Sequence, residues 1–368
     1  MFISDRNLLI YLFTFLGSKE QLSIIKQVCK DWNEIHHYAI VRWDRILTQD
    51  YAYKYQYIIS LCVNSCNLTE LIIPKRCKYI LCSDNKLTEL YVPEVCKYID
   101  CSYNNLTELI IPKGCEILKC YNNNIVRLTV SEGCKEINCN DNKLIQLTIP
   151  EGCKKIHCSE NKLTELTVPE GCKEIWCQYN NIIQLTIPEG CKDINCSNNK
   201  LTELTVPEGC NILFCGYNNL SKLTILGEIK LLNCCCNNLT QLNLSIKCKY
   251  LCCQYNNLTQ LIAPKGCKEI LCNDNKLIQL TVPEDCKEVE CYNNNLTELI
   301  LPDTCIKIDC SNNNLTEFYV PDECETLNCS NNNLSKLIIP RWCEYVNCSN
   351  NHNLNEINVS DECEVIYY

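Results

Sequence analysis

Apolar residues recur along most of this chain at a fixed period of 19 residues. Cysteine occupies every nineteenth position from Cys82 to Cys348, and an asparagine follows each of these cysteines three positions later, from Asn85 to Asn351. A preceding copy has Val63 in the cysteine column, and one residue is inserted in the last copy, which makes sixteen units. This period predicts a solenoid of stacked units, because one short unit cannot bury its own apolar face.

Each unit begins with a pattern that predicts a short strand. In the copy CKYILCSDNKLTELYVPEV, residues 77–95, the apolar Ile80 and Cys82 alternate with Tyr79, Leu81 and Ser83. A period of two places one face of a strand in a core, and stacked copies of such a strand would build a parallel sheet.

Two further columns constrain the rest of the unit. The asparagine that follows the strand is expected to hydrogen-bond backbone groups of its own unit and of the neighbouring unit, which would form a ladder. All twelve prolines lie in another column, from Pro74 to Pro340. Because proline has no N–H to donate, this column predicts an extended or polyproline-like segment and excludes a helix interior.

The apolar positions of the unit, with cysteine in two of the leucine places, resemble the pattern L-x-x-L-x-L-x-x-N-x-L of the leucine-rich-repeat family. The resemblance covers about five-sixths of the chain. It implies a repeat solenoid of sixteen 19-residue leucine-rich repeats. Such a solenoid would have a long curved parallel β-sheet, an extended or turn-rich convex side, and a concave strand face that binds a partner.

The first 60 residues lack the repeat columns and carry helical patterns instead. Ser4 or Asp5 can cap a first helix, and Ser18 with Gln21 forms a capping box for a second. The first of these helices would have Leu8, Leu9, Leu12, Phe13 and Leu16 on one face. A third short helix is expected to run through Trp32. So small a helical domain is expected to pack on a partner or on the solenoid.

This N-terminal segment resembles the F-box family. Residues 28–32 (VCKDW) match the closing Val-Cys-Lys-x-Trp of that family, and residues 13–16 (FTFL) match its Phe-x-x-Leu, whereas Ser4 replaces the opening proline. The resemblance implies a small all-α domain that docks on the Skp adaptor of a cullin-type ubiquitin ligase. The adaptor-binding residues it implies are Ile3, Leu8, Leu9, Leu12, Phe13, Leu16 and Val28. The alternative is a helical cap for the solenoid.

An F-box followed by repeats this regular is similar to proteins encoded by giant DNA viruses of the mimivirus type. The similarity implies that the partners are the Skp-type adaptor and the cullin ligase of the host, together with an unknown target protein. It also implies an intracellular location in the host cytoplasm. The expected domains are an F-box-like helical domain over 1–48, an aromatic-rich linker and N-terminal cap over 49–62, and the leucine-rich-repeat solenoid over 63–368.

The 36 cysteines have three possible roles. As free thiols they can fill a narrow core, as disulfides they would need an oxidising compartment, and as metal ligands they would need four converging thiolates. Their inward phase in two columns favours core filling. The run Cys234–Cys236 with Cys252 and Cys253 is the one place where thiols are also expected to reach the outer face, so a metal or redox role stays open there.

Charge and motifs favour binding over catalysis. The net charge of −10 disfavours nucleic acid and anionic membranes as partners, and no apolar run approaches the roughly 20 residues that span a bilayer. The four histidines lack a nucleophile at a recognisable spacing, and no glycine-rich phosphate loop occurs. We therefore expect neither an enzyme nor a cofactor.

The concave face offers a candidate binding site. In its outward columns, large apolar residues of the middle repeats are flanked by acidic ones, and exposed groups of this kind are typical of protein contacts. The residues expected to bind the partner are Glu174, Trp176, Asp193, Ile212, Phe214, Leu231, Tyr250 and Leu271. The functions that fit are a substrate receptor of an SCF-type ligase, a scaffold that binds or sequesters a host protein, and a cysteine-rich metal or redox sink.

Overall fold

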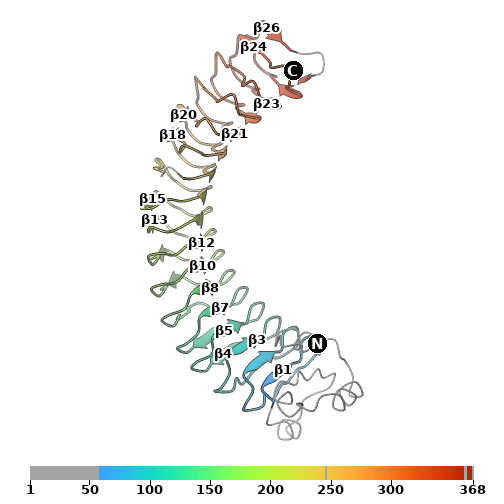
Figure 1. Ribbon diagram of the computed structural model, residues 1–368, viewed down its shortest axis with the longest axis vertical. Coiled ribbons are helices and arrows are strands. Elements are labelled where there is room, and N and C mark those ends of the chain that lie inside the picture. The colour runs from blue at the N-terminus through green and yellow to red at the C-terminus, as the bar shows by residue number, and fades with distance from the viewer. Residues whose placement is uncertain (1–57, 245–246, 360–362, 367–368) are drawn as a thin grey trace, which may run out of the picture. The chain divides into compact units, whose positions relative to one another are not determined.

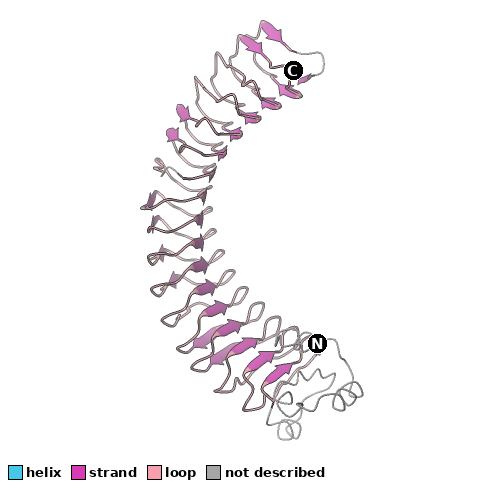
Figure 2. Ribbon diagram, viewed as in Figure 1, coloured by secondary structure: helices cyan, strands magenta, loops and turns pink. Residues whose placement is uncertain are grey.

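The structure is a computed structural model that describes residues 58–244, 247–359 and 363–366. The chain forms two compact units, unit 1 over Met1–Cys172 and unit 2 over Lys173–Tyr368. The helical domain expected over 1–48 lies outside the described residues, so it stays a prediction. Only strands and loops occur in the described parts of both units (Figure 2), and nothing helical there is long and apolar enough to cross a bilayer.

In unit 1, one short strand per turn builds the main sheet. Its strands are β1 (Ser60–Cys62), β2 (Tyr79–Leu81), β3 (Tyr98–Asp100), β5 (Ile117–Lys119), β7 (Glu136–Asn138) and β8 (Lys155–His157). Each pairs in parallel with the next, and the register joins residues 19 apart, such as Ile80 with Ile99. The sheet therefore confirms the predicted period, and its first strand lies inside the segment 49–62 that the sequence assigns to a linker and cap.

Unit 2 repeats this arrangement over eleven strands. They are β10 (Glu174–Trp176), β12 (Asp193–Asn195), β14 (Ile212–Phe214), β16 (Leu231–Asn233), β17 (Tyr250–Cys252), β19 (Glu269–Leu271), β21 (Glu288–Glu290), β22 (Lys307–Asp309), β23 (Thr326–Asn328), β25 (Tyr345–Asn347) and β27 (Glu364–Ile366). The parallel register again advances by 19 residues per strand. The middle residue of each strand up to β25 is buried, and its two neighbours face outward.

A second set of strands precedes the proline column. In unit 1 these are β4 (Glu108–Ile111), β6 (Arg127–Val130) and β9 (Glu165–Leu166). In unit 2 they are β11 (Gln184–Leu185), β13 (Glu203–Val206), β15 (Lys222–Ile225), β18 (Gln260–Ile262), β20 (Gln279–Thr281), β24 (Lys336–Ile338) and β26 (Glu356–Asn358). In unit 2 they lie opposite the main sheet (Figure 1). The segment is extended, as predicted, but its pairing into two-stranded sheets such as β13–β15 was not expected.

Asparagine side chains join successive turns. The Asn104 carboxamide donates from Nδ2 to the carbonyl of Cys101 in its own turn, at 3.1 Å, and to that of Cys82 in the preceding turn, at 3.0 Å. Its Oδ1 accepts the N–H of Leu87 at 3.0 Å. The same bonds recur at Asn123 and in unit 2 at Asn218. Each ladder asparagine therefore satisfies buried backbone groups that no strand pairs.

The residue before each ladder asparagine has a positive φ. From Asp84 to Asn350 these angles lie between 51° and 57°, in the left-handed region. Asparagine and aspartate tolerate this region better than other side chains, because their short polar groups bond locally. The frequent Asp-Asn and Asn-Asn pairs of the sequence therefore mark a turn that needs one left-handed residue in every unit.

Two cysteine columns fill the core. The strand column, which includes Cys82, Cys101 and Cys120, is fully buried and stacks turn upon turn behind the sheet. The other column, which includes Cys96 and Cys115, is also buried as far as Cys343. The 35 cysteines of the described residues are free thiols. A small apolar side chain at these positions lets consecutive turns lie close together.

The asparagine ladder predicts a local stability test. Asn104→Ala would leave the Leu87 N–H unpaired, and a buried group left without a partner costs about 1–3 kcal/mol. It would also remove the bond to the Cys82 carbonyl of the preceding turn, which would keep only its bond from Asn85. We expect the midpoint of urea unfolding, followed by circular dichroism, to fall clearly. The neighbouring Asn105 is exposed and provides the control, since Asn105→Ala should leave the midpoint almost unchanged. Equal effects of the two substitutions would contradict the ladder.

The buried thiols predict alkaline instability. Burial raises the pKa of Cys139 to about 12, whereas an unfolded chain has thiol pKa values near 8.5. The folded state thus binds more protons between these values, and the free energy of unfolding must decrease as the pH rises above about 9. We expect a falling urea midpoint from pH 8 to 10 in reducing buffer. Cys139→Ala should weaken this slope, by at most about 1.4 kcal/mol per pH unit, and an unchanged slope would count against the burial effect.

Candidate protein-binding surface

The outer face of the main sheet in unit 2 carries two rows of side chains, because the first and third residues of each strand both point outward. The first row runs Glu174, Asp193, Ile212, Leu231, Tyr250, Glu269, Glu288, Lys307. The second row runs Trp176, Asn195, Phe214, Asn233, Cys252, Leu271, Glu290, Asp309. Residues that follow one another in a row sit on paired strands, about 4.8 Å apart.

Large apolar side chains gather in the middle of this face. We call Ile212, Phe214, Leu231, Tyr250 and Leu271 the apolar patch. Tyr250 is 46% exposed, and the other four are half-buried. A shallow hollow of about 240 Å³ lies over the patch. The outward side chains that line it are Phe214, Leu231, Asn233, Tyr250, Cys252, Glu269 and Leu271. An apolar side chain of a partner would find complementary contacts here.

An acidic cluster borders the apolar patch on the next strands. We use this name for Glu269, Glu288, Glu290 and Asp309. Lys307 forms ion pairs with Glu288 and, at 3.2 Å, with Glu290. Burial and the neighbouring Glu288 raise the pKa of Glu269. This lysine pairs with two of the four carboxylates, so the cluster keeps a local negative charge beside an apolar hollow.

Of the five thiols expected to reach the outer face beside the apolar patch, Cys236 and Cys252 are partly exposed, whereas Cys234, Cys235 and Cys253 are buried. The Cys252 Sγ donates to the Oε1 of Gln254 at 2.8 Å, and the Cys235 thiol lies near Cys252. A Cβ on Gly216 would lie 2.8 Å from the Cys235 Sγ, so glycine leaves the room that this thiol occupies. The neighbouring Cys252 thiol and burial raise the pKa of Cys235, which disfavours the reactive thiolate. No cluster of three or more potential metal ligands occurs in the described residues.

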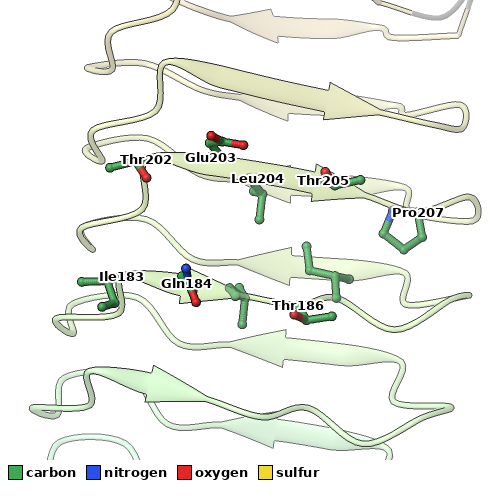
Figure 3. A pocket seen from close by; sticks show the side chains of 10 residues that line it. Ile183, Gln184, Thr186, Thr202, Glu203, Leu204, Thr205 and Pro207 are labelled. Carbon is green, nitrogen blue, oxygen red and sulfur yellow. The ribbon is translucent and has the colours of Figure 1, made fainter.

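A second hollow, of about 500 Å³, lies on the other face of unit 2 (Figure 3). It is formed by two neighbouring turns around β11 and β13. Its lining residues are Ile183, Gln184, Leu185, Thr186, Ile187, Thr202, Glu203, Leu204, Thr205 and Pro207. Glu203 is the one ionisable group among them, so this lining offers no acid–base pair or nucleophile with a base.

The structure brings only some of the expected partner-binding residues together. Phe214, Leu231, Tyr250 and Leu271 surround the hollow over the apolar patch. Ile212 adjoins it on β14 but does not line it. Glu174, Trp176 and Asp193 face outward on β10 and β12 and do not line it either, although Trp176 is 40% exposed. The adaptor-binding residues Ile3, Leu8, Leu9, Leu12, Phe13, Leu16 and Val28 lie outside the described residues.

The sequence did not single out Asn233 or Lys307, and it named Cys252 only as a thiol at the outer face. Asn233 and Cys252 line the hollow, and Lys307 pairs with Glu288 and Glu290 of the acidic cluster. All three occupy outward columns, so the period alone could have placed them. Asn233 and Lys307 lack the apolar character that marks a candidate contact residue in the sequence.

No protein-family model matches this chain. The curated proteins also contain no match. Several solved structures are similar. YopM from Yersinia enterocolitica WA-314 aligns with a TM-score of 0.78 and 22% identity, over 85% of this chain and 74% of that one.

Two further solved structures have lower TM-scores. The functional domain of InlJ from Listeria monocytogenes, which includes a cysteine ladder, has a TM-score of 0.57 and 23% identity, over 78% of this chain and 66% of that one. A leucine-rich-repeat protein of Leptospira interrogans, LIC12759, has a TM-score of 0.58 and 17% identity, over 92% of this chain and 99% of that one. Together with the stacked parallel strands and the asparagine ladder, these similarities show that the described residues have the fold of a leucine-rich-repeat solenoid.

Proposed function

We propose that this chain is a protein-binding adaptor whose target contacts the apolar patch and the acidic cluster of unit 2. The observation that carries the proposal is the patch itself. Five large apolar side chains face outward on consecutive strands, where exposure to water is unfavourable unless a partner covers them. Aromatic residues such as Phe214 and Tyr250 often dominate the binding energy of protein interfaces.

The chemistry of the two surfaces describes the partner. The patch fits an apolar side chain, and the carboxylates next to it fit a lysine or arginine. Complementary charges would also speed association at low salt. The target is therefore a protein segment that presents an apolar residue close to a basic one. The fold supports a binding role, because its long sheet face offers a broad surface to a partner protein.

The apolar patch can be tested by capture from host lysate. Phe214→Ser with Tyr250→Ser should remove specific interactors, since loss of hot-spot side chains costs roughly 2 kcal/mol or more each. The matched control is Ile262→Ser with Ile300→Ser, which removes two strongly exposed apolar side chains from the opposite face of unit 2. We expect the control to retain the interactors, as measured by quantitative mass spectrometry. If both double variants captured the same proteins as the unaltered chain, the patch would not be the target site.

We further propose that residues 1–48 dock the Skp adaptor of the host, so that the chain acts as substrate receptor of an SCF-type ubiquitin ligase in the host cytoplasm. The VCKDW and FTFL motifs support this proposal. The similarity of the whole arrangement to giant-virus proteins supports a host–virus context. The alternative is a scaffold that holds or sequesters a host protein without ubiquitin transfer.

Adaptor binding separates the two functions. Leu12→Asp with Leu16→Asp should abolish co-purification with Skp, because charges at an apolar contact are unfavourable. Target capture through unit 2 should persist, and circular dichroism should show an intact solenoid. If the unaltered chain captured its target but never Skp or cullin, the scaffold function would be correct.

A further inference from the structure

A row of alternating large and small side chains runs along the turn edge of unit 2. It occupies the left-handed position of each turn, and its members are Tyr179, Asn198, Tyr217, Cys236, Tyr255 and Asp274. The three tyrosines are each more than half exposed. We call them the tyrosine row. They recur at every second turn, with a smaller residue between.

Tyrosine is an unfavourable choice at these positions. The φ angles of Tyr179, Tyr217 and Tyr255 lie between 54° and 57°, where a left-handed backbone costs roughly 1–2 kcal/mol for most residues. Asparagine would fit the turn better, and it does so at many equivalent positions of this chain. Backbone conformations of this kind in exposed residues often accompany a binding function. Three exposed tyrosines in such a position therefore indicate a role other than stability.

Two of the tyrosines lie close to side chains of the following turn. The Cys236 thiol, one turn further on, is near enough to the Tyr217 hydroxyl to raise its pKa. The negative charge of the Asp274 carboxylate raises the pKa of Tyr255. Both phenol groups thus lie toward the following turn, and the row presents ring surfaces at a regular interval.

The interval matches a polyproline helix. Two turns of parallel sheet separate equivalent atoms by about 9.6 Å. A polyproline II helix rises 3.1 Å per residue with three residues per turn, so the same face returns after about 9.3 Å. Across the whole tyrosine row the two repeats differ by less than about 1 Å. Proline-rich segments bind aromatic surfaces, and their stiffness keeps the entropy cost of binding low.

Charge adds a preference to this surface. Asp274 is the one carboxylate among the six residues, at the Tyr255 end. Asn273 and Asn293 donate to its two oxygens at 2.7 and 2.8 Å, so its position is fixed. The net charge of the chain is −10. A negative edge disfavours stacked nucleic-acid bases and favours a peptide with a basic residue at the Asp274 end.

We propose that the tyrosine row binds a proline-rich segment with proline at every third position and a lysine or arginine at one end. The site is separate from the apolar patch, which lies on the outer face of the main sheet. It therefore adds a second contact for a partner, and a partner that binds both sites is held more tightly than by either site alone. Either site can exist without the other.

The test uses fluorescence anisotropy with labelled peptides of about 12 residues. The first peptide has proline at every third position and a terminal arginine. The second has the same composition, with the prolines shifted out of that period. The full chain should bind the first at least about tenfold more tightly than the second, which corresponds to roughly 1.4 kcal/mol. Equal binding of both peptides, or no binding of the first, would overturn the proposal.

Matched variants locate the binding site. Tyr179→Asn, Tyr217→Asn and Tyr255→Asn combined should reduce the affinity at least about tenfold. The urea midpoint should stay unchanged or rise, because asparagine suits the left-handed turn, so lost binding cannot be attributed to unfolding. Tyr103→Asn is the control, and it should leave the affinity unchanged. Tyr103 lies in unit 1 and has the same backbone conformation and a similar exposure. It is not part of a row, because Ser65 and Asp141 occupy the equivalent positions two turns before and after it.

Two further variants separate this site from the others. Asp274→Asn should weaken binding of the arginine-bearing peptide by a few-fold and reduce its salt dependence. Phe214→Ser with Tyr250→Ser removes the apolar patch and should leave peptide binding intact. The capture experiment therefore tests the apolar patch, and the peptide experiment tests the tyrosine row independently. If the triple tyrosine variant bound as tightly as the unaltered chain, the tyrosine row would have no such function.

Discussion

The carboxamide ladder is the interaction on which the rest of this structure depends. A turn of 19 residues must reverse direction after its strand, and the reversal leaves backbone N–H and C=O groups in the core without strand partners. One asparagine per turn pairs with them, as Asn104 does with the Cys82 and Cys101 carbonyls and with the Leu87 N–H. Because each bond set spans two turns, the ladder also fixes the distance and register between them. The outward rows of side chains follow from that register.

Because the register is fixed, outward side chains of successive turns line up in continuous rows on the surface. Inward columns change little from turn to turn, since small cysteines and medium-sized aliphatic residues must fit the same narrow core. Outward columns are free to vary, and in unit 2 they change from apolar at β14, β16 and β17 to acidic at β21. The apolar patch and the acidic cluster are therefore a property of neighbouring turns. A solenoid can acquire such a site by substitutions that leave its core untouched.

The cysteines suit the core and limit the conditions in which it is stable. A buried thiol packs as a small apolar group, and desolvation keeps it protonated. The raised pKa values of Cys77 and Cys153, each about 12, have this cause. Cys235 lies nearer the apolar patch, and its pKa is raised by the neighbouring Cys252 thiol and by burial.

The sequence by itself determined the architecture of the described residues. The units can stack in one way that satisfies the period of 19, the two inward cysteine columns, the asparagine at the turn and the proline column. The parallel register of Ile80 with Ile99 agrees with this stacking. It also placed each outward column, because a strand alternates its faces. The helical segment over 1–48 stays a prediction on sequence alone.

The tertiary structure decided what the columns do together. It showed that Phe214, Leu231, Tyr250 and Leu271 share one hollow with Asn233 and Cys252, whereas Trp176 does not line it. It paired the strands before the prolines, and it showed the positive φ that makes the exposed tyrosines unusual. The physical reason is that a periodic pattern fixes which side of the sheet a residue faces. The depth of a hollow and the ion pairs of Lys307 depend on side chains from adjacent turns meeting in space.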